Sequence, residues 1–542
     1  MAAQKSGSPF SLSAEGGQRT QGKDARRMNI MVARIIAESL KTTLGPKGMD
    51  KMLVDSLGDV VVTNDGATIL REMEVDHPVA RMMVEVARTQ EAVVGDGTTT
   101  AVVIAGELLR KAESLLDQNI HPTVITRGYT LAADKAQEAL DNIAIGISYK
   151  DVDILEKLAL TAITGKGVEK AKERLSNLLV SAIMAVADEQ DGKISVNTEN
   201  IKLEKKEGGG IEDTELIRGV IIDKERVSPA MPRKVKDASI LLINTALELK
   251  EREFSGQISV TEPGQIKAFL EEQRGGMKRT IEQIKGSGAA VLFSQKGIDE
   301  LAQYLLADAG IMAVRRVKKG DMEKLAKATG ASLVNSIDEL SQQHLGYAGL
   351  VEQIRVVNDE MIFITECREP KAVSILIRGG TKHITDEVER AIEDCLGAVP
   401  AAMEDGRVVV GGGATEIEIA KELRAYAETI GGKEQLAIEA FAESLESIPR
   451  TLAENAGLDP INALVGVKSA HKQKGSRIGL DIFDGQIKDM YQKGVIEPVR
   501  IKKQSIASAS EAAVMILRID DVVAAARLTK EMPPPASSPE RS

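Results

Sequence analysis

Residues 95–100 combine residue types that bind phosphate. They read Gly-Asp-Gly-Thr-Thr-Thr, and the apolar run 101–109 that follows predicts a buried helix. The first turn of a helix has backbone N–H groups without partners and carries the positive end of the helix dipole, so it attracts phosphate. Asp96 fits beside phosphates if Mg²⁺ bridges it to them. The same residues also fit an ordinary threonine N-cap after a glycine turn, and the motif alone does not decide between the two interpretations.

The elements before this motif contain two further glycine turns. Apolar residues at helical spacing predict a helix over 29–44, which Gly45 and Pro46 end. Two short apolar runs, 52–54 and 60–62, are typical of a β-hairpin. An Asp-Gly turn at 65–66 then leads into helices that continue to about residue 150.

In the centre of the chain, the sequence pattern changes from helical spacing to alternating apolar runs and helical stretches. Continuous apolar runs at 238–243, 289–293 and 311–314 predict buried strands. Helical stretches at 298–307 and 322–328 alternate with them. This alternation predicts an α/β domain with a partly parallel sheet.

An insertion at about 250–277 interrupts this α/β pattern. It is polar overall but carries Phe254, Ile258, Phe269 and Leu270. Apolar groups on such a segment indicate either a small packed subdomain or an exposed binding patch.

The last third of the chain returns to helices. A helix predicted over 385–399 contains Asp394, and a glycine triplet at 411–413 opens the next helix. Glu497 lies in an extended bend before Pro498. The Pro- and Ser-rich tail 531–542 is expected to be disordered.

Composition excludes several function classes. The 542 residues carry a net charge of −11, which argues against nucleic acid as the main partner. Two cysteines cannot form a disulfide framework. No apolar run approaches the roughly 18–20 residues that cross a bilayer, so we expect a soluble, cytoplasmic protein without a membrane partner.

Five segments in this order resemble those of group II chaperonins, the family of the archaeal thermosome and the eukaryotic cytosolic chaperonin. They are residues 43–51, 63–68, 95–100, 411–413 and 449–457. The resemblance covers nearly the whole chain and is carried by motifs of high combined specificity.

The resemblance implies a multidomain α + α/β fold. A mainly helical equatorial ATPase domain would comprise residues 1–150 and 404–542. A small intermediate hinge domain would comprise 151–219 and 371–403. An α/β apical domain, 220–370, would bind substrate and carry a helical lid protrusion at about 250–277.

The resemblance also assigns the site, which would bind ATP or ADP with Mg²⁺. Asp96 corresponds to the metal ligand, and Asp65 and Asp394 to the catalytic pair that positions water and takes its proton. Asp394 is chosen over its acidic neighbours Glu389 and Glu393 on the resemblance alone. The implied nucleotide-binding residues are Gly45, Gly97, Thr98, Thr99, Thr100, Thr164, Gly165, Lys166, Gly412 and Glu497.

Some of these roles keep alternatives. Lys166 would sense the terminal phosphate, and the alternative is an exposed loop lysine without a binding role. Glu497 would accept from the ribose hydroxyls, in place of an aspartate found in some relatives. No Gly-x-x-x-x-Gly-Lys-Ser/Thr loop occurs in the chain, so the 95–100 motif would take its place.

The expected function is that of an ATP-dependent chaperone that encloses unfolded client proteins. Its subunits, identical or paralogous, would form two stacked rings, usually of eight. Phe254, Ile258, Phe269 and Leu270 are candidate client or lid contacts, with local packing as the alternative. Two rival functions are a phosphotransferase that uses the same phosphate cradle, and a structural ring protein with a vestigial ATP site.

Overall fold

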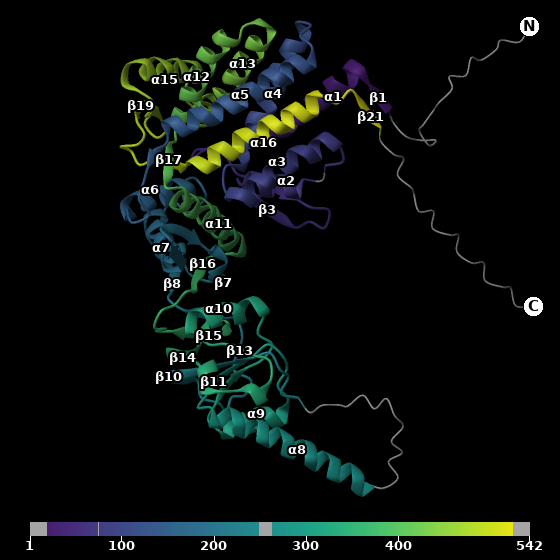
Figure 1. Cartoon of the computed structure of the whole chain (residues 1–542), viewed down its shortest axis with the longest axis vertical. Helices are drawn as coiled ribbons and strands as arrows, with labels where there is room; N and C mark the ends of the chain where they lie inside the picture. The colour runs from purple at the N-terminus through teal and green to yellow at the C-terminus, as the bar shows by residue number, and fades with distance from the viewer. Residues whose placement is uncertain (1–18, 74, 249–262, 524–542) are drawn as a thin grey trace, which may run out of the picture.

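The computed structural model describes residues 19–73, 75–248 and 263–523, which form three regions in a row (Figure 1). The two ends of the sequence, purple to blue and green to yellow, lie together in a helical region at one end of the molecule. The middle of the sequence, in teal, forms an α/β region at the other end. A middle region joins them, and the chain passes through it twice.

The helical region contains residues 19–146 and 407–523 of the described chain. Its elements are β1 (Arg19–Gln21), α1 (Gly22–Lys41), β2 (Lys51–Val54), β3 (Val60–Thr63), α2 (Gly66–Glu72), α3 (Pro78–Val94), α4 (Thr98–Asp117), α5 (Pro122–Ile143), β4 (Ile145–Gly146), β17 (Arg407–Val410), α12 (Ala414–Ile430), α13 (Gly432–Leu445), α14 (Ser447–Asn455), α15 (Pro460–Lys474), β18 (Ile478–Asp481), β19 (Gln486–Asp489), β20 (Ile496–Pro498), α16 (Val499–Leu517) and β21 (Asp521–Val523).

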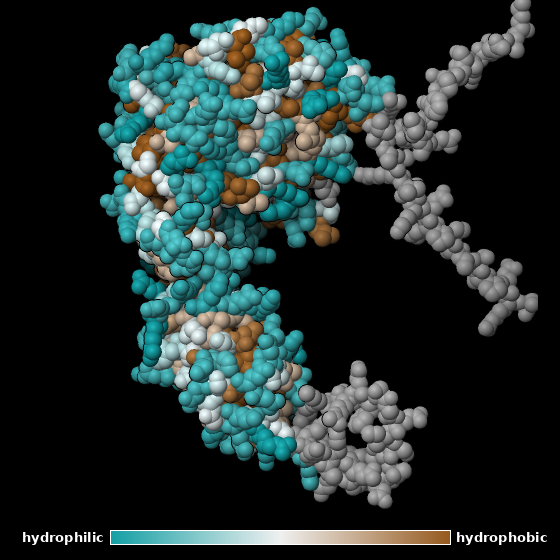
Figure 2. Space-filling model, in the orientation of Figure 1, coloured by the Kyte–Doolittle hydropathy of each residue, from teal (hydrophilic) through white to brown (hydrophobic). Residues whose placement is uncertain are grey.

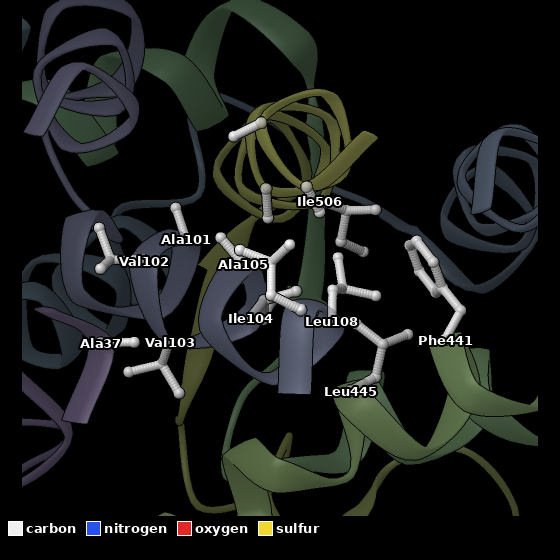
Figure 3. Packing of buried hydrophobic residues seen from close by; sticks show 14 of the residues in the cluster. Ala37, Ala101, Val102, Val103, Ile104, Ala105, Leu108, Phe441, Leu445 and Ile506 are labelled. Carbon is white, nitrogen blue, oxygen red and sulfur yellow. The ribbon is translucent and has the colours of Figure 1, made fainter. Parts of the chain in front are cut away.

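Helix α4 lies at the centre of the helical core. Ala101, Ala105 and Leu108 on α4 are each 0% exposed, so the helix is apolar on several faces, as a central helix must be. Figure 3 shows Leu108 beside Phe441 of α13 and below Ile506 of α16. The helix that begins with the phosphate-type motif is therefore fixed by packing from both halves of the sequence.

The middle region contains residues 152–217 and 373–405. Its elements are α6 (Val152–Ile163), α7 (Lys172–Val186), β5 (Ala187–Gln190), β6 (Lys193–Val196), a 3₁₀ turn (Thr198–Asn200), β7 (Ile201–Glu207), a second 3₁₀ turn (Ile211–Asp213), β8 (Glu215–Ile217), β16 (Val373–Gly379) and α11 (Lys382–Asp405). Strand β16 pairs in parallel with β7 and antiparallel with β8. The core of this region continues into the helical region through Val408, Ile496 and Ile501.

The α/β region contains residues 220–365. Its elements are β9 (Val220–Ile222), β10 (Lys234–Ile243), α8 (Pro263–Gly286), β11 (Val291–Ser294), α9 (Glu300–Asp308), β12 (Met312–Val314), α10 (Lys319–Thr329), β13 (Leu333–Val334), 3₁₀ turns (Ile337–Glu339 and Gln342–His344), β14 (Gly346–Val356) and β15 (Asp359–Thr365). The sheet order is β12-β11-β10-β14-β15-β9, and β13 also pairs with β10. The β10, β11 and β12 strands are parallel, and β14, β15 and β9 run antiparallel, so the predicted partly parallel sheet is confirmed.

Helix α8 extends away from the α/β region at the far end of the molecule (Figure 1). It includes the second part of the predicted protrusion but continues past residue 277 to Gly286. Met277 is 8% exposed and packs into the core, so the base of this helix belongs to the folded α/β region. Phe254 and Ile258 lie outside the described residues, as do the side chains of Phe269 and Leu270 and the tail 531–542.

The remaining local predictions agree with the structure, with shifted boundaries. The predicted hairpin is confirmed, because β2 pairs antiparallel with β3. The helix expected over 385–399 runs from Lys382 to Asp405 because Pro400 lies inside it instead of ending it. On the face shown in Figure 2, hydrophobic groups are scattered among predominantly hydrophilic ones. That the three regions are separate domains stays a prediction.

Candidate active site

A cavity of about 500 Å³ is lined by residues of both the helical and the middle region. All of the catalytic, metal and nucleotide-binding residues predicted from the sequence line it: Gly45, Asp65, Asp96, Gly97, Thr98, Thr99, Thr100, Thr164, Gly165, Lys166, Asp394, Gly412 and Glu497. They come from seven separate stretches of a chain of 542 residues. The fold therefore brings together in one cavity the residues that the resemblance assigns to one site.

Helix α4 begins at this cavity with a backbone suited to an anion. Gly97 is its N-cap residue with a φ of 83°, and no side chain caps the helix. The first turn therefore has N–H groups without helical partners at the cavity wall. A Cβ at Gly97 would lie 2.8 Å from Ile501 Cγ2, so both the positive φ and the close contact require glycine.

Asp65 is held at the start of α2, beside the threonine stretch 98–100 that begins α4. As the N-cap residue, its carboxylate accepts from the backbone N–H groups of Ala67 at 3.4 Å and Thr68 at 2.7 Å. The Thr98 hydroxyl lies 3.5 Å from its Oδ1. The cap fixes the direction of the Asp65 carboxylate beside the threonine stretch.

Asp394 and Lys166 meet in the cavity from different parts of the middle region. Asp394 projects from α11, and its Oδ2 lies 2.5 Å from Lys166 Nζ in the loop after α6. Lys166 Nζ also lies 3.5 Å from Asp96 Oδ1, in the α4 motif. This cluster spans the boundary between the two regions, with one cation among carboxylates.

The cluster perturbs its own protonation equilibria. Burial raises the pKa of Asp394 well above its ordinary value, and the Asp96 and Asp65 carboxylates add to the rise while Lys166 opposes it. Burial disfavours the Lys166 ammonium, but Asp394 and Asp96 outweigh burial and hold the Lys166 pKa above its ordinary value. An aspartate with a raised pKa accepts a proton more readily near neutral pH than an ordinary one.

The acidic neighbours of Asp394 face elsewhere. Glu389 pairs with Lys205 at 2.6 Å on the outside of α11. Glu393 is not among the residues that line the cavity. The position of Asp394 on the helix thus gives a structural reason to prefer it, which the sequence lacked.

Another part of the cavity lining presents apolar side chains that suit a nucleoside. Leu480, Ile482 and Met490 line it beside Gly412. The Gly412 carbonyl accepts from Leu480 N–H at 3.0 Å, which joins the glycine turn to strand β18. A Cβ at Gly412 would lie 3.0 Å from the Met490 methyl group, so the turn has little room for a side chain. Leu480, Ile482 and Met490 form this apolar wall, which was not predicted because its residues belong to no motif.

Glu497 takes part in a buried ion-pair network at the same cavity. Its Oε2 lies 2.8 Å from Lys502 Nζ, and Lys502 also pairs with Glu416 at 2.7 Å. Burial raises the Glu497 pKa, and Lys502 opposes the rise. Lys502 was not predicted, because it lies five residues beyond Glu497 and outside every sequence motif.

A metal would need ligands beyond the protein here. Within the described residues, no group of three or more His, Cys, Asp or Glu side chains is arranged to hold a metal ion. Mg²⁺ commonly binds through one or two carboxylates together with substrate phosphates and water. The Asp96 carboxylate, which is 32% exposed beside the α4 N-terminus, fits that mode.

A comparison with protein families matches residues 36–527 to the TCP-1/cpn60 chaperonin family. The chain belongs to this family. A thermosome subunit of Pyrococcus horikoshii is 61% identical over 529 residues, covering 98% of this chain and 96% of that protein. One from Methanopyrus kandleri is 60% identical over 516 residues, covering 95% of each.

A solved chaperonin structure supports the same assignment. The open-state monomer of a group II chaperonin from Methanococcoides burtonii is 47% identical, with a TM-score of 0.58. The match covers 79% of this chain and 100% of that one. The multidomain α + α/β fold and an ATP-dependent chaperone function thus follow from the family. Among the helices of the described residues, none is long and apolar enough to span a membrane.

Proposed function

We propose that this chaperonin hydrolyses ATP, with Mg²⁺, in the cavity between the helical and middle regions, and uses the cycle to fold client proteins. The observation that carries the proposal is the meeting of Asp394 and Lys166 of the middle region with Asp96 of the α4 motif. Groups from two regions complete one charged cluster. Hydrolysis in such a site depends on how the two regions close on each other.

The phosphate end would hold the charged part of the nucleotide. The N–H groups and hydroxyls of Thr98, Thr99 and Thr100 would donate to phosphate oxygens, and Gly45 would let the backbone approach them. Lys166 would add a point charge near the terminal phosphate. Asp96 would bind Mg²⁺, which when bound neutralises phosphate charge.

Asp65 and Asp394 would act on the attacking water. The two carboxylates face the cavity from opposite regions, and both influence the same electrostatic cluster. Asp394, whose pKa is raised, would accept the proton, and the capped Asp65 would orient the water. Thr164 and Gly165 would place the loop that carries Lys166.

The apolar part of the cavity lining would receive the nucleoside. Gly412 would lie against the sugar and base, with Leu480 and Met490 as an apolar wall. Glu497 would accept from the ribose hydroxyls, on the side away from Lys502.

At the level of the assembly, we propose two stacked rings of identical or paralogous subunits, with eight in each ring, in the cytoplasm. Unfolded client proteins would bind at the α/β region, through apolar groups at or near α8. Closure of the protrusion that includes α8 over the ring cavity would then enclose the client. Family membership and the position of α8 at the far end of the molecule support this arrangement.

The proposal is tested with the purified chain, ATP and Mg²⁺. Orthophosphate release should require Mg²⁺, light scattering should find a megadalton-scale particle, and a chemically denatured reporter enzyme should regain activity only with ATP. A monomer that transfers phosphate to a small molecule would favour the phosphotransferase. A ring without turnover would favour a structural role, and either result would overturn the proposal.

A further inference from the structure

Three carboxamide side chains contact the three glycine turns at the phosphate end of the cavity. Asn455 donates to the carbonyl of Leu44, Gln90 to that of Asp96, and Asn64 to that of Gly165. In every case the accepting carbonyl belongs to a turn whose residues line the cavity. Gln90 and Asn455 do not line the cavity, and Gln90 lies outside every sequence motif.

We propose that these carboxamides are positioning residues that set the peptide planes of the nucleotide cradle. A trans peptide is planar, so its N–H points away from its C=O. A side chain that holds the carbonyl of residues 44, 96 or 165 therefore also fixes the N–H of Gly45, Gly97 or Lys166. The inference deepens the proposed function and rests on it for the identity of the ligand, an adenine nucleotide with Mg²⁺.

Gln90 gives the clearest geometry. It is 0% exposed, and its Nε2 donates to the carbonyls of Asp96 at 2.8 Å and Ile501 at 3.3 Å. The N–H of the same Asp96–Gly97 peptide donates at 2.8 Å to Asp96 Oδ1. Gln90 thus orients the carboxylate that we assign to the metal, and it ties the turn to helix α16.

Asn455 acts on the first turn in the same way. From the end of α14 its Nδ2 donates to the carbonyls of Lys41 at 3.0 Å and Leu44 at 2.9 Å. The Lys41 carbonyl belongs to the last residue of α1, and the Leu44 carbonyl belongs to the turn that follows. Gln90 and Asn455 therefore hold turns within the helical region, and both should govern nucleotide and metal binding.

Asn64 differs because its hydrogen bond crosses between regions. It is 9% exposed in the turn after β3, and its Nδ2 lies 2.6 Å from the carbonyl of Gly165. A Cβ at Gly165 would lie 2.6 Å from Pro46 Cα, so this loop packs directly on the helical region. Asn64 should thus hold the loop that carries Lys166 next to Asp394, and it should govern turnover more than binding.

The test replaces each donor by an apolar side chain of similar size: Gln90→Met, Asn455→Leu and Asn64→Leu. Asn462→Leu is the matched control, because its exposed carboxamide bonds only the Asp459 side chain. Hydrogen exchange of the nucleotide-free protein is the first measurement. We expect faster exchange in residues 96–100 for Gln90→Met, and in residues 164–167 for Asn64→Leu, without a rise elsewhere.

Measurements of ADP binding and of turnover then distinguish Gln90 and Asn455, which hold turns within the helical region, from Asn64, which bonds across the two regions. Gln90→Met and Asn455→Leu should raise the Kd for ADP with Mg²⁺ by roughly three- to tenfold, the loss of one or two hydrogen bonds. Asn64→Leu should lower kcat by about the same factor and leave the Kd within about twofold.

The outcomes separate the inference from the proposed function. Uniformly faster exchange, unchanged exchange, or equal changes of Kd and kcat in all three variants would overturn the inference. If Gln90→Met fails to fold, Asn455→Leu tests the same binding prediction at a half-buried position at the end of α14. A wild-type chain without ATP turnover would instead overturn the proposed function, while the exchange measurement still tests the carboxamides.

Discussion

Replacing Asp394 by Asn separates chemistry from binding in this site. The Asp394 side chain is 14% exposed and lies 2.5 Å from Lys166. Asn has the same shape and keeps one acceptor for the Lys166 ammonium, so the loop should stay closed. It cannot take a proton from water. General-base catalysis contributes about 10²–10⁴ in rate, so kcat should fall by about that factor, or ~2.7–5.4 kcal/mol in activation free energy.

Single-turnover phosphate release and calorimetric ADP binding measure the two effects separately. The Kd for ADP with Mg²⁺ should change by no more than about threefold, since one neutral hydrogen bond replaces a charged one. Glu389→Gln is the matched control on the same helix, because Glu389 pairs with Lys205 outside the cavity. Turnover of Asp394→Asn within threefold of wild type, or an equal loss in Glu389→Gln, would refute the assignment.

Three further substitutions address the phosphate cradle, a buried ion pair and the predicted protrusion. Gly97→Ala should weaken ADP binding by about tenfold or more in calorimetry, because an L residue at positive φ costs about 1–2 kcal/mol before any clash; unchanged affinity would contradict the cradle. Burial raises the pKa of Glu418, but hydrogen bonds from Lys421 and His471 outweigh it and leave that pKa below its ordinary 4.5. The ionised Glu418 carboxylate therefore stabilises the folded state above pH 4.5, and this stabilisation is lost as pH falls through the lowered pKa. The free energy of unfolding in urea should thus be lower for Glu418→Gln than for wild type at neutral pH and equal to it in acid. A difference that persists in acid would refute this pH dependence. Replacing residues 250–273 by a short Gly-Ser linker, which leaves Met277 in the core, should preserve ATP turnover and abolish protease protection of a bound client; retained protection would exclude a lid.

Short-range signals predicted local turns of the site, and the family resemblance assigned the roles of its residues. A glycine with positive φ before a helix, a carboxylate at an N-cap and a hairpin between apolar runs each depend on residues within one turn of one another. Asp65 and Gly97 were therefore predictable from the sequence. Their convergence in one cavity was expected from the family resemblance and not from the spacing of residues.

Long-range contacts could not be predicted in this way. Gln90 and Asn455 reach carbonyls that depend on how α3, α14 and α16 pack, which no local pattern encodes. The apolar wall at Leu480 has the composition of any small hydrophobic cluster. Strands β14 and β15 were both missed. In β14 buried residues alternate with half-buried and charged ones, which weakens the apolar signal of a strand. In β15 residues 361–364 form a continuous buried apolar run, which was a usable signal.

The boundaries of elements were also beyond local rules. Pro400 normally indicates a helix end, yet it is buried inside α11. The long helix places Asp394 near its middle, with β17 and the glycine triplet directly after its end. Tertiary packing of α11 against both regions thus overrides the local preference.

The proposed catalytic site is tested most directly by a structure of the assembled chain with ADP, Mg²⁺ and aluminium fluoride. We expect nucleotide in the cavity, metal bound to Asp96, and the fluoride group between the 97–100 backbone and the Asp394 carboxylate. Nucleotide bound elsewhere, or Asp394 turned away from the fluoride group in that state, would contradict the proposed site.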